Sequence, residues 1–423
     1  MKILFIHQNF PAQFKHLARI FAEDKNNEVK FICRYPNKVI IEGVEKIVSK
    51  PITKNKNQRG HRYLRTFNEA VYMGQAGWRA CKRLKDQGFE PDIIYAHSGW
   101  GDSMFVKDVF PNTPYIAYME FFYRAFGADI GFLPNRKVTA DDIARTRVKN
   151  ANHLINLEAC DWAISPTNWQ VSLHPKDFYH KFSVIHEGVD TDVIKPIKKK
   201  KKELLIEKNK ISFSSELITY ITRNCERYRG FEQAMEAISI LSEKRPNATF
   251  IIVGKNGVGY GSNSQEAIGY KERILEKMRL NSDRVHCYNY LPYDKYIEVL
   301  QHSTVHIYLT VPFVLSWSMI EAMSAGCAIV ASSTQPVKEV IKDGENGMLA
   351  DFFNPKEIAS KVEFLLKNTE IREKVSKNAR RCVESKYSIK KIIPDYIKLI
   401  KGVMKQKMDA RLKKKLSPKG TVF

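Results

Sequence analysis

The sequence lacks the cysteine patterns of extracellular and zinc-binding proteins. Its seven cysteines are scattered, odd in number and include no Cys-x-x-Cys pair. Structural zinc sites and disulfide frameworks both need closely spaced or paired cysteines. We therefore expect free thiols in a reducing cytoplasm, with no disulfide framework and no metal site.

Long hydrophobic runs are also missing. The start of the chain has only the short apolar run 3–6 before polar residues follow, whereas a secretory signal needs about 7–15. The stretch 301–320 has no acidic residue, lysine or arginine and approaches the length of a membrane span, but it contains His302, His306 and Pro312. A buried strand, a turn and a helix start explain it better. We expect neither a signal peptide nor a membrane span.

Acidic residues are too few to balance the basic ones: 46 Asp and Glu stand against 69 Lys and Arg, a formal net charge of +23. This excess predicts anionic partners, which could be nucleic acid, anionic lipid or a phosphate-bearing small molecule. The 43% hydrophobic content argues against general disorder. A length of 423 residues suggests two or three domains.

Strand and helix patterns alternate along the chain in two blocks. Strands are predicted at 2–6, 28–33, 91–97, 114–118, 163–165 and 183–185, and again at 217–221, 248–253, 285–288, 305–309 and 327–331. A lysine-rich break at 195–210 separates the blocks, and helices at 355–366, 370–384 and 389–403 follow the second one. Such alternation predicts an α/β protein with parallel sheets. The basic tail from residue 405 is expected to be frayed.

Arginines follow the strand at 217–222. Arg223, Arg227 and Arg229 would lie at the carboxyl edge of the sheet, where open α/β folds bind ligands, and guanidinium groups suit phosphate oxygens. A solvated basic loop remains the alternative.

The next strand ends in a glycine-rich stretch, 254–261, in which Gly254 is our candidate for close approach to a ligand. This signal is weak. The Gly-Lys-Ser/Thr of a P-loop is missing, and no helix follows directly as in a dinucleotide fingerprint.

Residues 305–332 read as strand, loop, helix and strand. The helix N-terminus near Ser316, Trp317 and Ser318 would open toward the sheet edge and suit an anion. Glu321 lies one turn in, among apolar residues, and needs a hydrogen-bonding partner such as a sugar hydroxyl. An ordinary helix-face glutamate is the alternative.

The segment 321–332 (Glu-Ala-Met-Ser-Ala-Gly-Cys-Ala-Ile-Val-Ala-Ser), followed by 339–349, resembles family 4 of the retaining glycosyltransferases. Arg223 with Arg229-Gly230 is similar to that family's Arg and Lys-Gly pair, and 186–192 with Pro196 resembles its Asn-Gly-Val-Asp motif. The resemblance covers most of the chain and is strongest over 223–351. It implies the GT-B fold, in which two Rossmann-like domains face each other across a cleft.

The resemblance also implies roles for individual residues. Arg223 and Arg229 would hold the diphosphate of a nucleotide-sugar, and Glu321 would bind its ribose. The amides around Ser316, Trp317 and Ser318 would cap the diphosphate. The base pocket would be formed by Tyr290, Leu291 and Pro292.

The chain departs from the family pattern at four places. Phe313 stands where the family has a glutamate that touches the donor sugar, and Arg229 replaces the lysine. Residues 9–14 replace the glycine pair expected after the first strand. Glu120 lies where the family often has a histidine, so it is a candidate catalytic group that orients the sugar or acts on the acceptor. An ion pair between Glu120 and Arg124 is the alternative.

One further motif and two further side chains are weaker candidates. Asp190-Thr191-Asp192 looks like an Asp-x-Asp metal site, but it lies inside the domain-boundary segment, and arginines can neutralise the leaving group instead. His97 and Asp102 would face the cleft of the implied fold; a hydrogen-bonded structural histidine is the preferred interpretation of His97.

We therefore predict an acceptor-binding domain at 1–195, a linker at 196–214, a nucleotide-sugar domain at 215–385, and a returning helix with a basic tail at 386–423. The predicted activity is metal-independent, retaining transfer of a sugar from a UDP- or GDP-linked donor to a saccharide or lipid-linked acceptor, in bacterial surface polysaccharide or glycolipid synthesis. No cofactor is expected. An inactive nucleotide-binding or scaffold subunit is the alternative, motivated by Phe313.

Charge alone would suggest nucleic acid, but no zinc spacing or RNA-binding aromatic signature supports it, so we expect no nucleic-acid partner. The lysine run and the tail fit loose attraction to anionic lipid. The expected location is the cytoplasm, with peripheral attachment to the inner face of the cell membrane.

Overall fold

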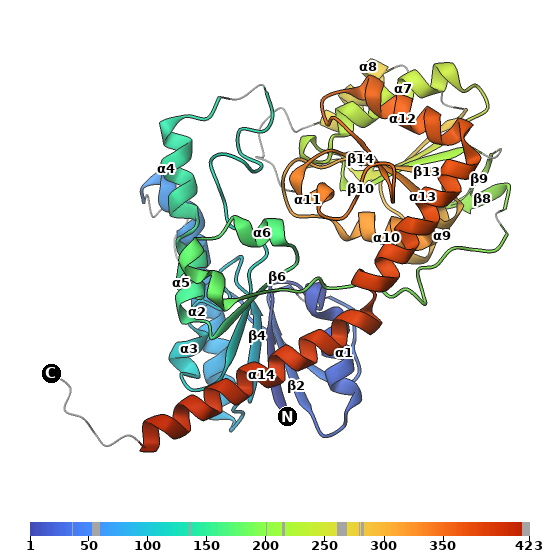
Figure 1. The fold of residues 1–423 in the computed structure, drawn as a ribbon. Coiled ribbons are helices and arrows are strands. Elements are labelled where there is room, and N and C mark those ends of the chain that lie inside the picture. Colours follow the sequence, from blue (N-terminus) through green and yellow to red (C-terminus); the bar gives the residue numbers. More distant parts are fainter. Residues whose placement is uncertain are drawn as a thin grey trace. The chain divides into compact units, whose positions relative to one another are not determined.

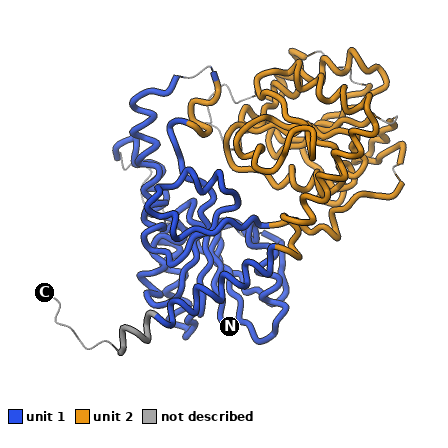
Figure 2. Tube along the Cα trace, in the orientation of Figure 1, with its two compact units in different colours: residues 1–126, 134–187, 392–423 blue, residues 127–133, 188–391 orange. Residues whose placement is uncertain are grey.

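The computed structural model describes residues 1–35, 37–52, 60–134, 137–199, 201–213, 216–259, 269–278, 280 and 283–416, with side chains up to residue 409. The chain forms two compact units (Figures 1 and 2). Unit 1 contains Met1–Phe126, Pro134–Glu187 and the chain from Ile392; unit 2 contains Gly127–Leu133 and Gly188–Lys391. The short segment Gly127–Leu133 therefore belongs to the unit formed mainly by the second half of the chain.

Unit 1 is built on one parallel sheet with the strand order β3-β2-β1-β4-β5-β6-β7. The strands are β1 (Lys2–Ile6), β2 (Glu28–Cys33), β3 (Val44–Val48), β4 (Ile93–His97), β5 (Tyr115–Tyr118), β6 (Trp162–Ser165) and β7 (Phe182–Val184). The chain runs outward from β1 through β2 to β3, and then restarts at β4 on the other side of β1. The winding direction thus reverses between β1 and β4, and open α/β sheets usually bind ligands beyond the carboxyl ends of the strands at such a point.

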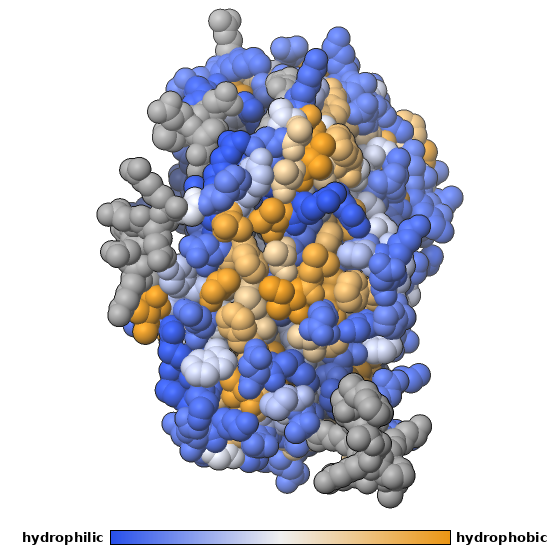
Figure 3. Space-filling model, turned by 90° about the vertical axis from the view of Figure 1, so that its left-hand side faces the viewer, coloured by the Kyte–Doolittle hydropathy of each residue, from blue (hydrophilic) through white to orange (hydrophobic). Residues whose placement is uncertain are grey.

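Helices flank this sheet. They are α1 (Lys15–Glu23), α2 (Arg65–Asp86), α3 (Val106–Val109), α4 (Ala140–Lys149), α5 (Ala151–Ala159) and α6 (Asn168–Ser172), with short 3₁₀ turns that include η1 (Ala12–Phe14), η2 (Arg62–Leu64) and η3 (Lys176–Lys181). Apolar side chains gather on one face of the molecule (Figure 3). Helices α2, α4 and α5 and the turn η2 all carry exposed large apolar residues.

Unit 2 contains a second parallel sheet, with the order β12-β11-β10-β13-β14-β15. Its strands are β10 (Leu217–Asn224), β11 (Thr249–Lys255), β12 (Val285–Tyr288), β13 (Val305–Tyr308), β14 (Ala328–Ser332) and β15 (Met348–Ala350). The winding direction reverses here between β10 and β13, which are neighbours in the sheet. Both sheets are parallel, so the α/β prediction is confirmed.

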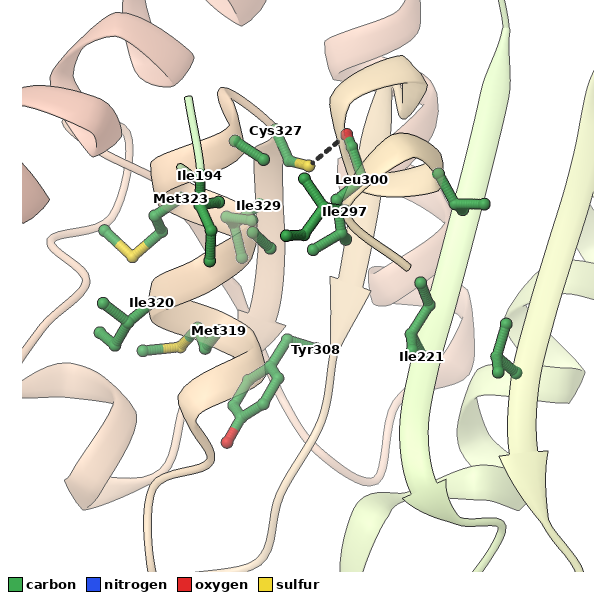
Figure 4. Close-up of a cluster of buried hydrophobic side chains, with 14 of the residues drawn as sticks. Ile194, Ile221, Ile297, Leu300, Tyr308, Met319, Ile320, Met323, Cys327 and Ile329 are labelled. Atoms are coloured by element: carbon green, nitrogen blue, oxygen red, sulfur yellow. Dashed lines mark hydrogen bonds between the residues drawn. The ribbon is translucent and has the colours of Figure 1, made fainter. Parts of the chain in front are cut away.

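The helices of unit 2 alternate with its strands, as predicted. They are α7 (Phe231–Lys244), α8 (Tyr270–Met278), α9 (Tyr293–His302), α10 (Trp317–Ala325), α11 (Gln335–Lys338), α12 (Pro355–Lys367) and α13 (Thr369–Cys382), with the 3₁₀ turn η4 (Arg227–Arg229) and a π-helical turn, η6 (Val383–Tyr387). Figure 4 shows part of the core, where Met319, Ile320 and Met323 of α10 lie beside Ile329 of β14. Cys327 Sγ donates to the Leu300 carbonyl at 3.0 Å, so α10 and α9 are joined at their ends.

Two predictions about lysine-rich segments need correction. The expected linker contains a hairpin, β8 (Glu203–Ile206) paired antiparallel with β9 (Asn209–Ser212), because Leu204, Ile206 and Ile211 turn to one side and are buried. Helix α14 (Ile389–Leu416) continues well past residue 405, and Lys407 pairs with Asp161 of unit 1. Residues 200, 214 and 417–423 of these segments lie outside the described ones.

Within the described residues, no helix combines the length and the apolar character needed to cross a bilayer. The stretch 301–320 is divided among the end of α9, strand β13, a loop and the start of α10, as the sequence predicted.

Candidate functional site

The loops that follow β10 and β13 meet at the point where the sheet of unit 2 changes direction. The first loop carries Arg229 and Gly230, and the second runs from Leu309 to Ser316. They are in direct contact, because the Val311 amide donates to the Tyr228 carbonyl at 3.0 Å. Crevices at such switch points are the usual ligand sites of open α/β sheets.

Gly230 explains how the two loops come so close. Its φ of +60° is in the left-handed region, and a Cβ placed there would lie 2.8 Å from Cβ of Leu309. Any side chain at this position would therefore push the second loop away. The Arg-Gly pair fixes a tight loop as well as supplying a cation.

Arg229 is buried beneath the second loop, with 6% of its surface exposed. Its guanidinium donates to Thr310 Oγ1 at 2.8 Å and to the Val314 carbonyl at 3.4 Å. These bonds hold a positive charge beneath the second loop and also set the path of residues 310–314. Arg223, the next-to-last residue of β10, is exposed at the same edge.

Helix α10 begins at this edge of the sheet, as the sequence predicted. Ser316 is its N-cap, and Ser316 Oγ accepts from the Ser318 amide at 3.3 Å. The Ser316 amide itself donates to the Tyr308 hydroxyl at 2.9 Å. Two of the three amides expected to face an anion are thus engaged within the protein, while the positive end of the helix dipole still points to the site.

Glu321 is held by two tyrosines of α9. Its Oε1 accepts from the Tyr293 hydroxyl at 2.9 Å and its Oε2 from the Tyr296 hydroxyl at 2.8 Å. Burial and the charge of Glu321 raise the pKa of both phenols above the ordinary range, so both hydroxyls remain donors. The predicted sugar-binding carboxylate is therefore oriented in advance. The tyrosines were not predicted, although they lie one helical turn apart.

The residues predicted for a base pocket divide into exposed and buried ones. Tyr290 is 61% exposed, and Lys255 Nζ lies 5.3 Å from its ring centroid. Leu291 is buried in the core of unit 2, and Pro292 is the N-cap of α9. Tyr290 is thus the member of this set that offers a flat face to a base.

Gly254 has a packing reason to be glycine. A Cβ there would lie 2.7 Å from Cys225 Sγ and 2.9 Å from Cγ2 of Thr222. Its carbonyl accepts from Lys271 Nζ at 2.8 Å. The end of the glycine-rich stretch, residues 260 and 261, lies outside the described residues.

Phe313 is buried where the family pattern has a carboxylate, and its ring packs against that of Tyr228 in a tilted arrangement, with centroids 5.6 Å apart. The Tyr228 hydroxyl donates to Asp129 Oδ2 at 2.8 Å. Asp129 comes from Gly127–Leu133, the segment of the first half of the chain that belongs to unit 2. Sequence reasoning missed Asp129, since nothing local marks a segment that packs against residues so distant in the chain.

The same segment has an aromatic contact with unit 2. The ring of Phe132 lies 5.4 Å from that of Phe352 and stacks on Phe353 at 5.0 Å, centroid to centroid. This aromatic contact and the hydrogen bond from the Tyr228 hydroxyl together place the buried carboxylate of Asp129 beside the loop that carries Arg229.

Glu120 lies in unit 1, just after β5. Its Oε1 accepts from Gln13 Nε2 at 2.8 Å, and its Oε2 lies 3.5 Å from His97 Nε2. The amide of Gly99 donates to His97 Nδ1 at 3.0 Å, which leaves the ring proton on Nε2, toward Glu120. Arg124 Nε instead donates to the Leu173 carbonyl at 2.6 Å, so the alternative of a Glu120–Arg124 ion pair is not observed.

Further polar groups surround the switch point of unit 1. His97 stacks on Trp100 with centroids 4.2 Å apart and meets His7 edge-on at 4.9 Å. Burial, reinforced by the nearby His97, lowers the pKa of His7 well below its ordinary value, so His7 is neutral. Sequence analysis did not select Gln13, His7 or Trp100, although all three lie beside the ends of strands.

Asp102 is buried, with 3% of its surface exposed. It forms a buried ion pair with Arg34 Nε at 2.9 Å, and burial nevertheless raises the pKa of its carboxyl group. We assign it a structural role.

The Asp-x-Asp sequence has a local structural explanation. Asp190 Oδ1 accepts from the amides of Asp192 and Val193 at 3.1 and 3.2 Å, and Asp192 pairs with Lys390 at 2.7 Å. Among the described residues, no cluster of three or more histidine, cysteine or acidic side chains is arranged to hold a metal. A cavity of ≈ 470 Å³ between β7 and α14 of unit 1 contains none of the predicted site residues.

The predicted residues thus fall into two groups. Arg223, Arg229, the α10 N-terminus and Glu321 belong to unit 2, at the ends of β10 and β13 and on the helix that follows. Glu120 belongs to unit 1, together with His97 and Gln13.

Two sequence families match this chain. Residues 25–194 match "Glycosyl transferase family 4 group", and residues 201–382 match "Glycosyl transferases group 1". A similar curated protein is an uncharacterized glycosyltransferase of Methanocaldococcus jannaschii, 26% identical over 226 residues, which are 52% of this chain and 53% of the relative. Another is the N,N'-diacetylbacillosaminyl-diphospho-undecaprenol alpha-1,3-N-acetylgalactosaminyltransferase of Campylobacter jejuni, 27% identical over 42% of this chain and 43% of the relative. The chain spans about half the length of the curated relatives it matches.

Solved structures share the fold across nearly the whole chain. A sucrose-phosphate synthase of Thermosynechococcus elongatus aligns with a TM-score of 0.70 at 14% identity, covering 96% of this chain and 100% of that one. The Anabaena protein HepE, in complex with UDP and glucose, aligns with a TM-score of 0.66 at 14% identity, covering 95% of this chain and 100% of that one. Two Rossmann-like units and these neighbours confirm the predicted GT-B fold.

Proposed function

Because the chain belongs to the group 1 glycosyltransferases, with the family 4 sequence pattern in its first half, we propose that it transfers a sugar from a nucleotide-sugar to an acceptor hydroxyl with retention of anomeric configuration. The observation that carries this proposal is in unit 2. Two arginines, a helix N-terminus and a pre-oriented carboxylate surround one switch point.

The proposed chemistry is electrostatic. When the bond between the sugar and the diphosphate breaks, negative charge grows on the leaving diphosphate. Arg223 at the rim, Arg229 at the floor and the positive end of α10 would stabilise this charge, and such prearranged groups are often the largest catalytic term. In this proposal arginines replace a divalent cation, so activity would be independent of added metal.

The proposed donor is linked to UDP or GDP. Tyr290 would stack on the base and Glu321 would accept hydrogen bonds from the ribose, in exchange for one of its tyrosine partners. The fold neighbour that holds UDP and glucose supports the uridine form.

The proposed acceptor is a saccharide or a lipid-linked saccharide, in the assembly of a bacterial surface polysaccharide or glycolipid. The name of the Campylobacter jejuni relative, which acts on a sugar carried by diphospho-undecaprenol, supports a lipid-linked acceptor. With such an acceptor, the protein would act at the inner face of the membrane and would be attached there peripherally.

We assign the acceptor to unit 1 and give Glu120 the contact with its hydroxyl. The carboxylate is about one-fifth exposed, so a ligand can reach it, and Gln13 and His97 fix its direction. Glutamine at this position should keep the shape but lose the negative charge.

A mass-spectrometric screen tests the proposal. The purified chain is incubated with a panel of UDP- and GDP-sugars and simple acceptors, and nucleotide release and product mass are followed with and without EDTA. Turnover of one donor that survives EDTA supports the proposal. Nucleotide binding without turnover on any acceptor would instead favour an inactive subunit, the function suggested by Phe313.

A further inference from the structure

Unit 1 carries an exposed apolar face that takes no part in either group of site residues. Its large side chains are 36–45% exposed and come from η2, α2, α4 and α5: Leu64, Trp78, Ile143, Leu154 and Ile155. Helices α2, α4 and α5 pack against one another, and η2 contacts α2 and α4. Apolar side chains form a broad patch on the corresponding face (Figure 3). We call these five residues the apolar face.

Helical spacing places these residues in two stripes on elements that pack together. Leu64, which ends η2 and is the N-cap of α2, lies almost four turns before Trp78, with the half-buried Phe67 and Val71 between them. Ile143 and Leu154 lie about three turns apart on α4 and α5, which are separated only by Asn150 in a helical conformation. Contiguous exposed apolar surface of this kind marks an interaction site.

The charges on the same elements indicate the chemistry of the partner. Basic residues outnumber acidic ones there: Arg62, Arg65, Arg79, Lys82, Arg83, Lys85, Arg145, Arg147 and Lys149 against Glu69, Asp86, Asp141, Asp142 and Glu158. Several of them form exposed ion pairs, such as Arg65 with Glu69 and Lys82 with Asp86. The net charge of these four elements together is positive.

We propose that the apolar face is the surface by which this protein docks on an anionic lipid bilayer. The inference rests on the proposed action at a membrane and names the surface responsible. Tryptophan prefers the membrane interface, leucine and isoleucine bury their side chains among the lipids, and arginine and lysine contact headgroup phosphates. A second copy of the chain fits less well, because a two-fold dimer would set this positive surface against itself.

The proposed docking surface differs from the basic segments that charge alone suggested as membrane contacts. The lysine run and the tail predicted loose electrostatic attraction to anionic lipid. The apolar face would also insert side chains among the lipids. Because salt screens only the electrostatic attraction, it should release the protein from the membrane only in part.

Co-sedimentation with vesicles tests the proposal, using phosphatidylcholine with or without phosphatidylglycerol. The full chain should sediment with the anionic vesicles. The double variant Trp78→Glu, Ile155→Glu should lose at least ten-fold in affinity, whereas Leu205→Glu, at a 57% exposed apolar residue of β8, should not. Equal binding by wild type and the double variant, or no binding by wild type, would overturn the proposal.

A conservative variant, Trp78→Phe, controls for the case in which the double variant does not fold. Lipids brominated along the acyl chain should quench the tryptophan fluorescence of the wild type, and Trp78→Phe should remove the largest share of that quenching. Unchanged quenching in Trp78→Phe would contradict the proposal, as would a shift of the double variant from dimer to monomer in sedimentation velocity. Nucleotide release with a soluble acceptor should be the same in all variants, which separates a failure of docking from a failure of the proposed activity.

Discussion

The Tyr228 hydroxyl donates a hydrogen bond to Asp129 across almost one hundred residues of sequence, while its ring packs at a tilt against Phe313. The residue where the family pattern has a carboxylate is thus apolar, and a carboxylate from a distant segment is held next to it. Tyr228 is the immediate neighbour of Arg229, so this arrangement borders the proposed diphosphate site.

We expect Asp129 to contact the donor sugar. Asp129→Asn should lower kcat/KM for the nucleotide-sugar by about ten- to a hundred-fold, since a hydrogen bond to a charged group contributes about 1.5–3 kcal/mol. The affinity for the free nucleotide, measured by calorimetry, should not change. Tyr228→Phe keeps the ring on Phe313 and should cost less. Wild-type kinetics in Asp129→Asn would limit Asp129 to a structural role.

Replacing Arg223 and replacing Arg229 should have different effects on activity and stability. Arg223 is exposed, so Arg223→Ala should leave the melting temperature unchanged and lower kcat by about 10²–10³. Arg229 is buried against Thr310 and Val314, so Arg229→Ala should lose activity and also about 1–3 kcal/mol of unfolding free energy, because those partners are left unsatisfied. Lys244→Ala, at an exposed cation of α7, is the control. Full activity in Arg223→Ala would remove it from the site.

Removal of one tyrosine should make Glu321 a better acceptor for ribose. Tyr293 is 48% exposed and occupies Oε1, so a ribose hydroxyl must displace it, whereas Tyr296 can stay on Oε2. Tyr293→Phe should therefore tighten nucleotide binding a few-fold, and Glu321→Ala should weaken it, as measured by calorimetry with UDP and GDP. Weaker binding in Tyr293→Phe would mean that the tyrosine positions Glu321 and is not displaced.

The sequence predicted those parts of the molecule that depend on local pattern. Buried apolar runs predicted all strands of the second sheet except β15, and the N-terminus of α10 and the burial pattern around Glu321 followed from neighbouring residues. Hairpin β8–β9 was missed because lysines flank it, although Glu203-Leu204-Leu205-Ile206 alternates in burial. Strand β3 was missed because none of its residues is fully buried.

The remaining features depend on contacts between distant residues. No local property of Asp129 shows that it meets Tyr228, and nothing near Glu120 shows that Gln13 and His97 hold it. The end of α14 was predicted as frayed because it is basic; the pairing of Lys407 with Asp161 is a tertiary contact that composition does not reveal.

Buried histidines should make the protein acid-sensitive. Burial lowers the pKa of His306 in unit 2 to about 3, and those of His153 and His174 in unit 1 to about 3 and about 4. In the unfolded chain these rings take up a proton near pH 6.5. Between the two values the unfolded state binds more protons, so stability is full above about pH 6.5 and falls as the pH drops, by up to about 1.4 kcal/mol per pH unit for each ring.

His306→Asn should therefore flatten the dependence of unfolding free energy on pH in unit 2. The slope is the informative quantity, because the variant also alters the 2.8 Å hydrogen bond between Thr219 Oγ1 and His306 Nδ1 and so changes absolute stability at every pH. Urea unfolding between about pH 7 and pH 5 measures the slope, with His180→Asn, at an exposed histidine of unit 1, as the control. Asp102 opposes the trend in unit 1, since its raised pKa lets the folded state hold a proton that the unfolded chain releases. An identical slope for wild type and His306→Asn would show that His306 does not contribute to the acid sensitivity.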